Sequence, residues 1–92
     1  MPELIPNQQL LAHLAEIPDW SRQGGAIRRT FEFDAFLDGI EFVRKVANLA
    51  EEADHHPDID IRWRKVHLLL TTHSASGLTE NDISLAKAID SL

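Results

Sequence analysis

The sequence has no cysteine, no long apolar run and only nine basic residues. Without cysteine, disulfides, thiolate nucleophiles and cysteine metal sites are excluded. A membrane-spanning helix needs about 20 consecutive apolar residues, and no apolar run here approaches that length. The formal charge of −6 and the pI near 5.2 argue against direct contact with nucleic acid, which requires a basic face. We therefore expect a soluble, cytoplasmic protein with neither a nucleic acid nor a membrane as partner.

The length of 92 residues predicts one domain spanning residues 1–92. A domain of this size buries roughly 60–65% of its unfolded surface, so its core is marginal and association with a second chain would help it. The first twenty residues carry acids and prolines where a signal peptide would be basic and then continuously apolar. No secretory leader is expected.

Apolar periodicity and turn residues predict an α+β domain. The expected elements are a helix over 7–17, a hairpin over 20–33 about Gly24-Gly25, a helix over 34–55, strands over 59–63 and 65–73 joined at Arg64-Lys65, and a helix over 79–92. Asn7, Asp34 and Thr79 are the expected N-caps, and Asp82 completes a near capping box with Thr79. The order α-β-β-α-β-β-α predicts a four-stranded antiparallel sheet with three helices packed on one face.

The long helix over 34–55 carries two apolar stripes, although a helix lying on one sheet needs only one. The first stripe is Phe36, Ile40, Val43, Ala47 and Ala50, and the second is Phe42, Val46, Leu49 and Ala53. The surplus favours a second stripe buried against another subunit, in a homodimer or homotetramer. A deeply embedded helix is the alternative.

The stretch ADHHPDI, residues 53–59, places two histidines directly before a proline. Neighbouring side chains diverge in both helices and strands. Pro57 also disfavours the α region for His56 and pushes it into an extended conformation. The pair His55-His56 is therefore expected on a stiff bend.

Four of the five histidines, including His67 and His73, lie between residues 55 and 73, so a metal site is one interpretation of them. On one strand, however, residues six apart are separated by roughly 20 Å, too far to bind one ion. Adjacent histidines rarely chelate together, and no E-x-x-H or H-x-x-x-H pair is present. No metal and no cofactor are expected, and no serine lies on a strand-to-helix elbow to serve as a nucleophile.

Acid–base chemistry is the remaining reading of the histidines, because imidazole exchanges protons near neutrality. Asp82 is expected to orient a histidine or bind the ligand, or to cap the last helix, and a capping role can coexist with either of the others. Trp63 is interpreted as a core residue, and the alternative is an aromatic side chain that stacks on a bound ligand. His13 is read as a solvated histidine on the polar face of a helix, and His67 as an exposed strand residue.

One spaced pattern resembles the pterin-4a-carbinolamine dehydratase family. It comprises Glu51, His55-His56-Pro57, Trp63, His73 and Asp82. The closing segment THSASGLTENDISLAKAID, the aromatic-rich hairpin and the long helix extend the likeness over nearly the whole chain. Ser74, Ala75 and Asn81 depart from residues common in relatives, which puts their contacts to substrate or partners in doubt.

The resemblance implies dehydration of 4a-hydroxytetrahydropterin to quinonoid dihydropterin, in support of tetrahydropterin recycling. It implies a pterin surrounded by His55, His56 and His73, with His56 as the acid at the 4a-hydroxyl. Glu51, Pro57, Trp63 and Asp82 become substrate-binding or supporting residues. Two alternatives stay open: a protein-binding module of the dimerisation-cofactor type, and a pterin site acting in molybdenum cofactor metabolism.

Overall fold

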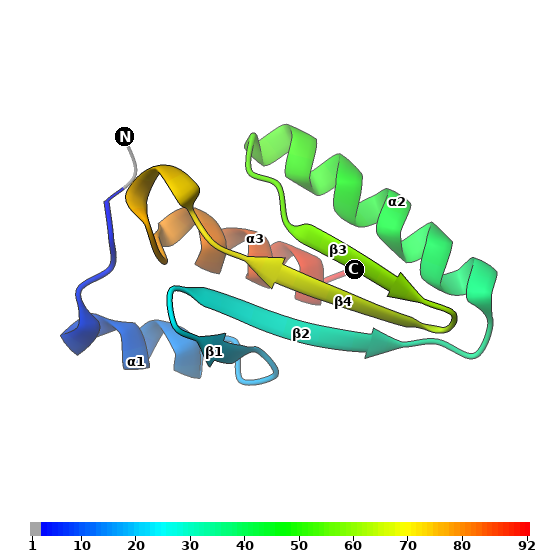
Figure 1. Cartoon of the computed structure of the whole chain (residues 1–92), viewed down its shortest axis with the longest axis horizontal. Helices are drawn as coiled ribbons and strands as arrows, with labels where there is room; N and C mark the ends of the chain where they lie inside the picture. The colour runs from blue at the N-terminus through cyan, green and yellow to red at the C-terminus, as the bar shows by residue number, and fades with distance from the viewer. Residues whose placement is uncertain (1–2) are drawn as a thin grey trace.

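The computed structural model describes residues 3–92, and the predicted order of helices and strands is confirmed (Figure 1). The elements are α1 (Asn7–Ala15), β1 (Ser21–Gln23), β2 (Ala26–Glu32), α2 (Phe36–Ala53), β3 (Asp58–Arg62), β4 (Lys65–Leu70), the 3-10 helix η1 (His73–Ala75) and α3 (Glu80–Asp90). The fold is of the predicted α+β class. Within residues 3–92, no helix is long and apolar enough to cross a membrane.

The strands form one antiparallel sheet in the order β1-β2-β4-β3. The two hairpins lie side by side, because β2 pairs with β4 from Ile27 opposite Leu70 to Glu32 opposite Lys65. Successive residues of a strand point to opposite faces. The register therefore gives the sheet one apolar face, and β1 and β3 form its two edges.

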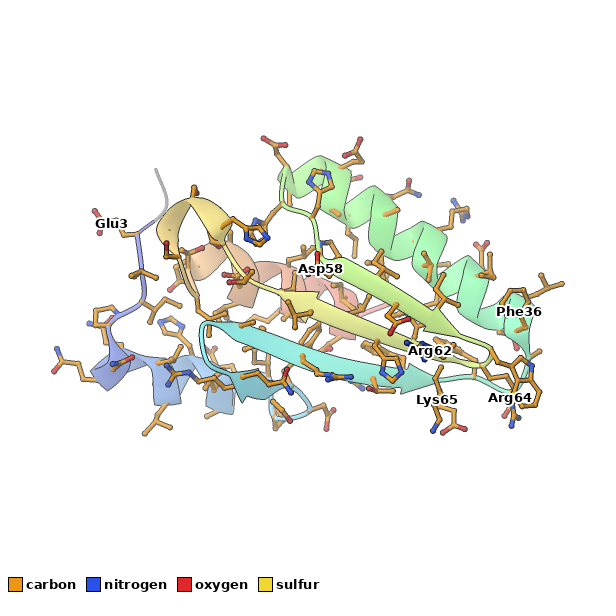
Figure 2. All side chains as sticks on the ribbon, viewed as in Figure 1. Glu3, Phe36, Asp58, Arg62, Arg64 and Lys65 are labelled. Atoms are coloured by element: carbon orange, nitrogen blue, oxygen red, sulfur yellow. The ribbon has the colours of Figure 1, made fainter. Side chains whose placement is uncertain are left out.

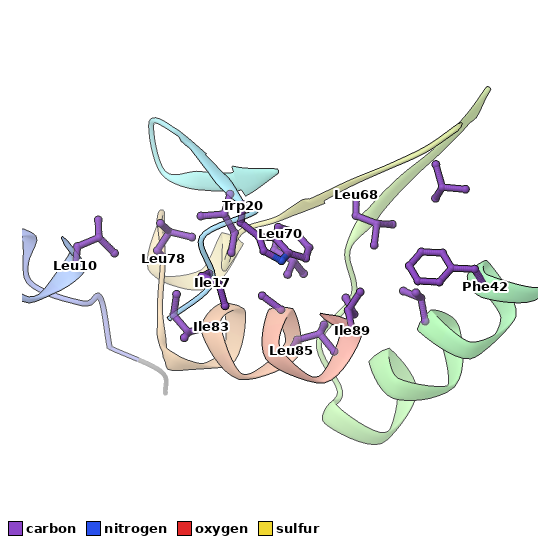
Figure 3. Close-up of a cluster of buried hydrophobic side chains, with 14 residues drawn as sticks. Leu10, Ile17, Trp20, Phe42, Leu68, Leu70, Leu78, Ile83, Leu85 and Ile89 are labelled. Atoms are coloured by element: carbon purple, nitrogen blue, oxygen red, sulfur yellow. The ribbon is translucent and has the colours of Figure 1, made fainter. Parts of the chain in front are cut away.

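All three helices contribute to a single hydrophobic core against that apolar face, as predicted (Figure 3). The central strand β4 supplies Val66, Leu68 and Leu70, each with no exposed surface. Trp20, which is 5% exposed, closes the core and donates its indole N–H to Asp90 of α3 at 2.9 Å. The core residues from the helices are Leu10, Phe42, Val46, Ala50, Ile83, Leu85, Ala86 and Ile89.

The predicted cap of α3 is confirmed. The Thr79 side chain accepts a hydrogen bond from the backbone N–H of Asn81 at 3.2 Å. The Asp82 carboxylate accepts the backbone N–H of Thr79 at 2.9 Å. Together these contacts form a capping box, so the start of α3 is fixed by the side chains that the sequence pattern picks out.

The predicted caps Asn7 and Asp34 are wrong. Asn7 is the first residue of α1, and Pro6 before it takes the cap position, with its carbonyl accepting the N–H groups of Gln9 and Leu10. A proline has no N–H to leave unpaired and has a fixed φ, so it suits a helix start. At α2 the cap position falls one residue later than predicted, on the extended residue Ala35, with no side-chain hydrogen bond.

The expectation that Trp63 is a core residue is wrong. β3 ends at Arg62, which pairs with Lys65, so Trp63 and Arg64 form the hairpin turn one residue earlier than predicted. Two-residue hairpin turns favour positive φ, and Trp63 adopts φ 53°. Its side chain is 70% exposed, with the Arg64 guanidinium 4.4 Å from the ring centroid.

Two residues of the second stripe of α2, Phe42 and Val46, face the core of their own chain, so their assignment to a subunit interface is wrong, whereas Leu49 is half-buried and Ala53 is exposed. Phe42 is 9% exposed and Val46 is fully buried, and Phe42 packs on the rings of Phe31 and Phe33 with centroids 4.6 and 5.1 Å away. The α2 residue with the most exposed large apolar side chain is Leu37. Association between chains stays a prediction, and the buried Phe42 and Val46 are not available to it.

Val46→Glu is expected to unfold the single chain rather than to separate subunits. A glutamate at this fully buried position leaves an uncompensated charge in the core, which costs on the order of 3–5 kcal/mol. Thermal unfolding followed by circular dichroism measures the loss, and light scattering reports the mass. Ala47→Glu is the matched control, because Ala47 is the next residue of α2 and is exposed. A folded Val46→Glu chain of reduced mass would restore the interface assignment.

Candidate active site

The histidine pair lies on the predicted bend, between the end of α2 and the start of β3. Asp54 ends α2 in the left-handed conformation (φ 49°, ψ 44°), and the backbone N–H of His55 donates to the Ala50 carbonyl at 3.0 Å. The chain then runs through His55, His56 and Pro57 without helix or strand structure. Pro57 keeps His56 out of the α region, so the bend presents both imidazoles at one end of the sheet.

His55 forms a hydrogen bond with Asp82, a residue in the first turn of α3. Its Nε2 lies 2.6 Å from Oδ1 of Asp82. The imidazole is only 11% exposed, and the carboxylate is completely buried. Asp82 therefore caps α3 and contacts His55 at the same time, so two of the roles predicted for it coexist, while its binding of a ligand stays a prediction.

His56 forms the second pair, with Glu51 of the last turn of α2. The Nε2 of His56 lies 2.6 Å from Oε2 of Glu51. Here the imidazole is 57% exposed and the carboxylate 76% exposed. The two neighbouring histidines thus have matching carboxylate partners but opposite environments, one dry and one open to water.

His73 reaches the same region by a different route from the predicted one. The strand over 65–73 is shorter than expected, because β4 ends at Leu70 and His73 begins η1. Thr72 pairs with Gly77 at the base of this loop, with the N–H of Thr72 donating to the Gly77 carbonyl at 2.9 Å. The Thr72 hydroxyl donates to Asp82 at 2.8 Å. His73, which is exposed, therefore directly follows a residue bound to the partner of His55.

Trp63 is not brought to the histidines within one chain. Asp58 begins β3 on the histidine side, and Arg62, Arg64 and Lys65 lie at the far end of the hairpin in Figure 2. Six residues of largely extended chain separate His56 from Trp63, which places the two roughly 23 Å apart at strand rise. Within the sequence pattern, side-chain contacts join His55 to Asp82 and His56 to Glu51. Pro57 directly follows His56, and His73 directly follows Thr72, which contacts Asp82, whereas Trp63 lies at the opposite end of β3.

Thr72 is the member of the site that sequence reasoning missed. Its side chain falls on the core face of its strand, in alternation with Val66, Leu68 and Leu70, and it is 4% exposed. A buried hydroxyl requires a hydrogen-bond partner. The alternation of apolar residues along β4 therefore indicates that the Thr72 hydroxyl is buried and needs a hydrogen-bond partner.

The remaining histidines have partners away from this neighbourhood. Nδ1 of His67 lies 2.7 Å from the Thr30 hydroxyl on the adjacent strand. Nε2 of His13 lies 3.2 Å from Glu80. Among residues 3–92, no group of three or more histidine, aspartate or glutamate side chains is arranged to hold a metal ion.

The arrangement provides groups that can give and take protons. One imidazole is held by a buried carboxylate, a second lies exposed beside an exposed carboxylate, and a third follows on η1. Imidazoles suit this task because both protonation states are accessible near neutral pH. No nucleophile is required for such chemistry.

A family model described as pterin 4 alpha carbinolamine dehydratase matches residues 3–92. The chain belongs to this family. The resemblance drawn from the histidine pattern is therefore confirmed. The dehydratase family model spans every element from α1 to α3, including all the residues that form the two histidine–carboxylate pairs.

Curated relatives of this dehydratase family agree over nearly their whole length. A Mycobacteroides abscessus protein with the provisional name pterin-4-alpha-carbinolamine dehydratase is 54% identical over 87 residues, covering 95% of this chain and 93% of the relative. A Thermomicrobium roseum protein with the same provisional name is 58% identical over 79 residues, covering 86% and 85%.

Two solved structures share the fold. A transcriptional coactivator/pterin dehydratase from Brucella melitensis matches with a TM-score of 0.90 at 30% identity, over 95% of both chains. A pterin dehydratase-like protein, identified as a RuBisCO assembly factor in the alpha-carboxysome, matches with a TM-score of 0.69 at 25% identity, over 79% of this chain and 87% of that one.

Glu51→Gln is expected to change the free energy of unfolding by no more than about 1 kcal/mol, because exposed ion pairs contribute little. Asp82→Ala is the contrasting variant. It removes the cap contact and the buried partner of His55, with an expected loss on the order of 3–5 kcal/mol. Urea unfolding of both variants measures the difference. An equal loss in both would mean that the His56–Glu51 pair is structural.

Proposed function

We propose that this protein dehydrates 4a-hydroxytetrahydropterin, of the tetrahydrobiopterin type, to quinonoid dihydropterin and water. Membership of the dehydratase family supports the substrate class. The observation that carries the proposal is the juxtaposition of a buried His55–Asp82 pair and an exposed His56–Glu51 pair on one bend. Such a bend can hold one imidazole still while the other moves to the reacting atoms.

The reaction needs one acid and one base. The substrate carries a hydroxyl on C4a and a hydrogen on the adjacent N5. Protonation of the hydroxyl oxygen lets the C4a–O bond break and water leave, the N5 lone pair forms the C4a=N5 double bond, and the N5 proton passes to a base. No hydride, metal or covalent intermediate is involved, so groups that exchange protons near neutrality suffice.

We assign the acid role to His56. Its imidazole is exposed enough to reach a bound substrate, and its Nε2 is held 2.6 Å from Oε2 of Glu51. His55 and His73 pack on the pterin ring and share the proton transfer from N5. Asp82 and Glu51 are supporting groups. Pro57 holds the bend, and Trp63 has a role in this site only if a second chain supplies it.

His56→Ala and His73→Ala are each expected to lower the dehydration rate by about 10²–10⁴, the usual effect of removing a general acid or base. Unaided water loss from the carbinolamine sets a floor under the measured deficit. The measurement is a coupled assay of 4a-hydroxytetrahydropterin breakdown with purified protein. His13→Ala and His67→Ala are the controls, because both side chains have partners elsewhere. Full activity in folded His55, His56 and His73 variants would remove the enzymatic proposal.

Exhaustive treatment with a chelator is expected to leave the activity unchanged. The proposed steps are proton transfers alone, and nothing in them requires a Lewis acid. The rate before and after chelation, in the same coupled assay, provides the measurement. Lost activity that returns on adding zinc would contradict the mechanism.

A binding role is the second candidate, because the Brucella melitensis neighbour is titled a transcriptional coactivator as well as a pterin dehydratase. The two candidates separate on the histidines. A binding module tolerates loss of His55, His56 and His73 provided that the chain folds, whereas the dehydratase does not. The coupled assay on these variants therefore decides between them.

A further inference from the structure

A buried hydroxyl chain holds the carboxylate of Asp82. Its Oδ2 accepts two hydrogen bonds, from the Thr72 hydroxyl at 2.8 Å and from the backbone N–H of Thr79 at 2.9 Å. The two threonine hydroxyls lie 2.8 Å apart. Thr72, Thr79 and Asp82 are 4%, 1% and 0% exposed, so water does not compete for these contacts.

The direction of each proton in this chain follows from valence. An ionised carboxylate only accepts, so the single hydroxyl proton of Thr72 points to Asp82. Because the Thr72 proton points to Asp82, the proton between the two threonine oxygens must come from Thr79. The Thr79 hydroxyl therefore donates to the Thr72 oxygen. The Thr79 oxygen in turn accepts the backbone N–H of Asn81. Every donor in the chain points toward Asp82, which leaves its Oδ1 to His55.

We propose that Thr72 and Thr79 are positioning residues that fix the tautomer of His55. The proton between a carboxylate and an imidazole lies on the nitrogen, the more basic of the two. Nε2 of His55, at 2.6 Å from Oδ1 of Asp82, therefore carries a hydrogen. Nδ1 is then the nitrogen that exchanges a proton with the substrate, and this last step alone depends on the proposed dehydratase function.

The hydroxyl chain makes a sharp prediction for Asp82→Asn. An asparagine side chain has one oxygen and one NH₂ group. The backbone N–H of Thr79 can only donate, so it selects the oxygen for the Oδ2 position, and the NH₂ group faces His55. Nε2 of His55 must then accept, and its hydrogen moves to Nδ1. The variant inverts the tautomer instead of loosening the ring, as the corresponding change does in serine proteases, where it lowers kcat by about 10⁴.

The test is ¹⁵N NMR of the full chain labelled at histidine, with the His55 signals assigned by their absence in His55→Gln. Spectra are recorded as the pH is raised to about pH 10, well above the ordinary imidazole range, so that they report the neutral form. The expected tautomer is Nε2–H in the parent and Nδ1–H in Asp82→Asn. An Nδ1–H tautomer in the parent, or an unchanged Nε2–H tautomer in Asp82→Asn, would overturn the proposal.

Thr72 is tested by the exchange of the His55 Nε2 proton with solvent. Thr72→Val removes the donor to Asp82, and we expect exchange to be faster by about tenfold or more, the scale of a hydrogen bond to a charged group. Thr72→Ser retains the hydroxyl and should restore slow exchange. Thr71→Val is the matched control, since the Thr71 hydroxyl donates to the Gly25 carbonyl instead. Equal exchange in Thr72→Val and the parent would exclude a positioning role.

These spectra do not depend on activity, so the two proposals fail separately. If the protein shows the expected tautomers but no dehydratase activity, the proposed function is excluded and the proposed role of Thr72 and Thr79 is retained. Dehydratase activity with the opposite tautomer would do the reverse. In an active chain, Asp82→Asn should lower kcat by at least about 10²-fold, the lower end for an acid–base group, while Thr71→Val retains the parent rate.

Discussion

The buried carboxylate of Asp82 is the interaction on which the rest of the site depends. An ionised group costs a great deal to bury unless its oxygens are fully hydrogen-bonded. Here one oxygen receives His55, and the other receives Thr72 and the N–H of Thr79. The contact with Thr79 caps the start of α3, the contact with Thr72 ties down the segment after β4, and the contact with His55 ties down the bend after α2. Helix capping and histidine orientation are therefore a single structural feature, and neither can be changed without the other.

The two histidine–carboxylate pairs show how burial divides the work between similar groups. Both pairs have a nitrogen–oxygen distance of 2.6 Å, so distance does not distinguish them. Solvent does, because water screens the exposed His56–Glu51 pair and competes for both of its partners. The buried pair is shielded from water, whereas the exposed pair is open to it. The proposed acid, His56, therefore belongs to the pair that a bound substrate can reach.

Local chemistry made part of the fold predictable from the sequence. Pro57 acts on the residue before it, so the bend at His55-His56 follows from two adjacent positions. The capping box between Thr79 and Asp82 is contained within one turn of helix. Alternation along β4 separates core from surface residues over a few positions. In each case the residues that determine the structure are close to one another in the sequence.

The predictions that were wrong or missing concern residues whose positions depend on parts of the chain distant in the sequence. Periodicity shows that α2 has two apolar stripes, but which one meets the sheet depends on where Phe31 and Phe33 of the preceding hairpin lie. The position of Trp63 depends on the register between β3 and β4, which is set along the whole strand pair. Thr72 and Asp82 lie 10 residues apart, and their contact requires the loop between them to close. These outcomes depend on packing between elements, which no local pattern records.

The exposed turn at Trp63 gives the molecule two optical reporters with opposite surroundings. Trp20 is buried and hydrogen-bonded to Asp90, whereas Trp63 is exposed to solvent at the tip of the β3–β4 hairpin. The fluorescence of Trp20 follows the integrity of the core, and that of Trp63 follows events at the end of the sheet farthest from the histidines. A contact made there by another molecule would shift the emission of one indole while the other stays constant.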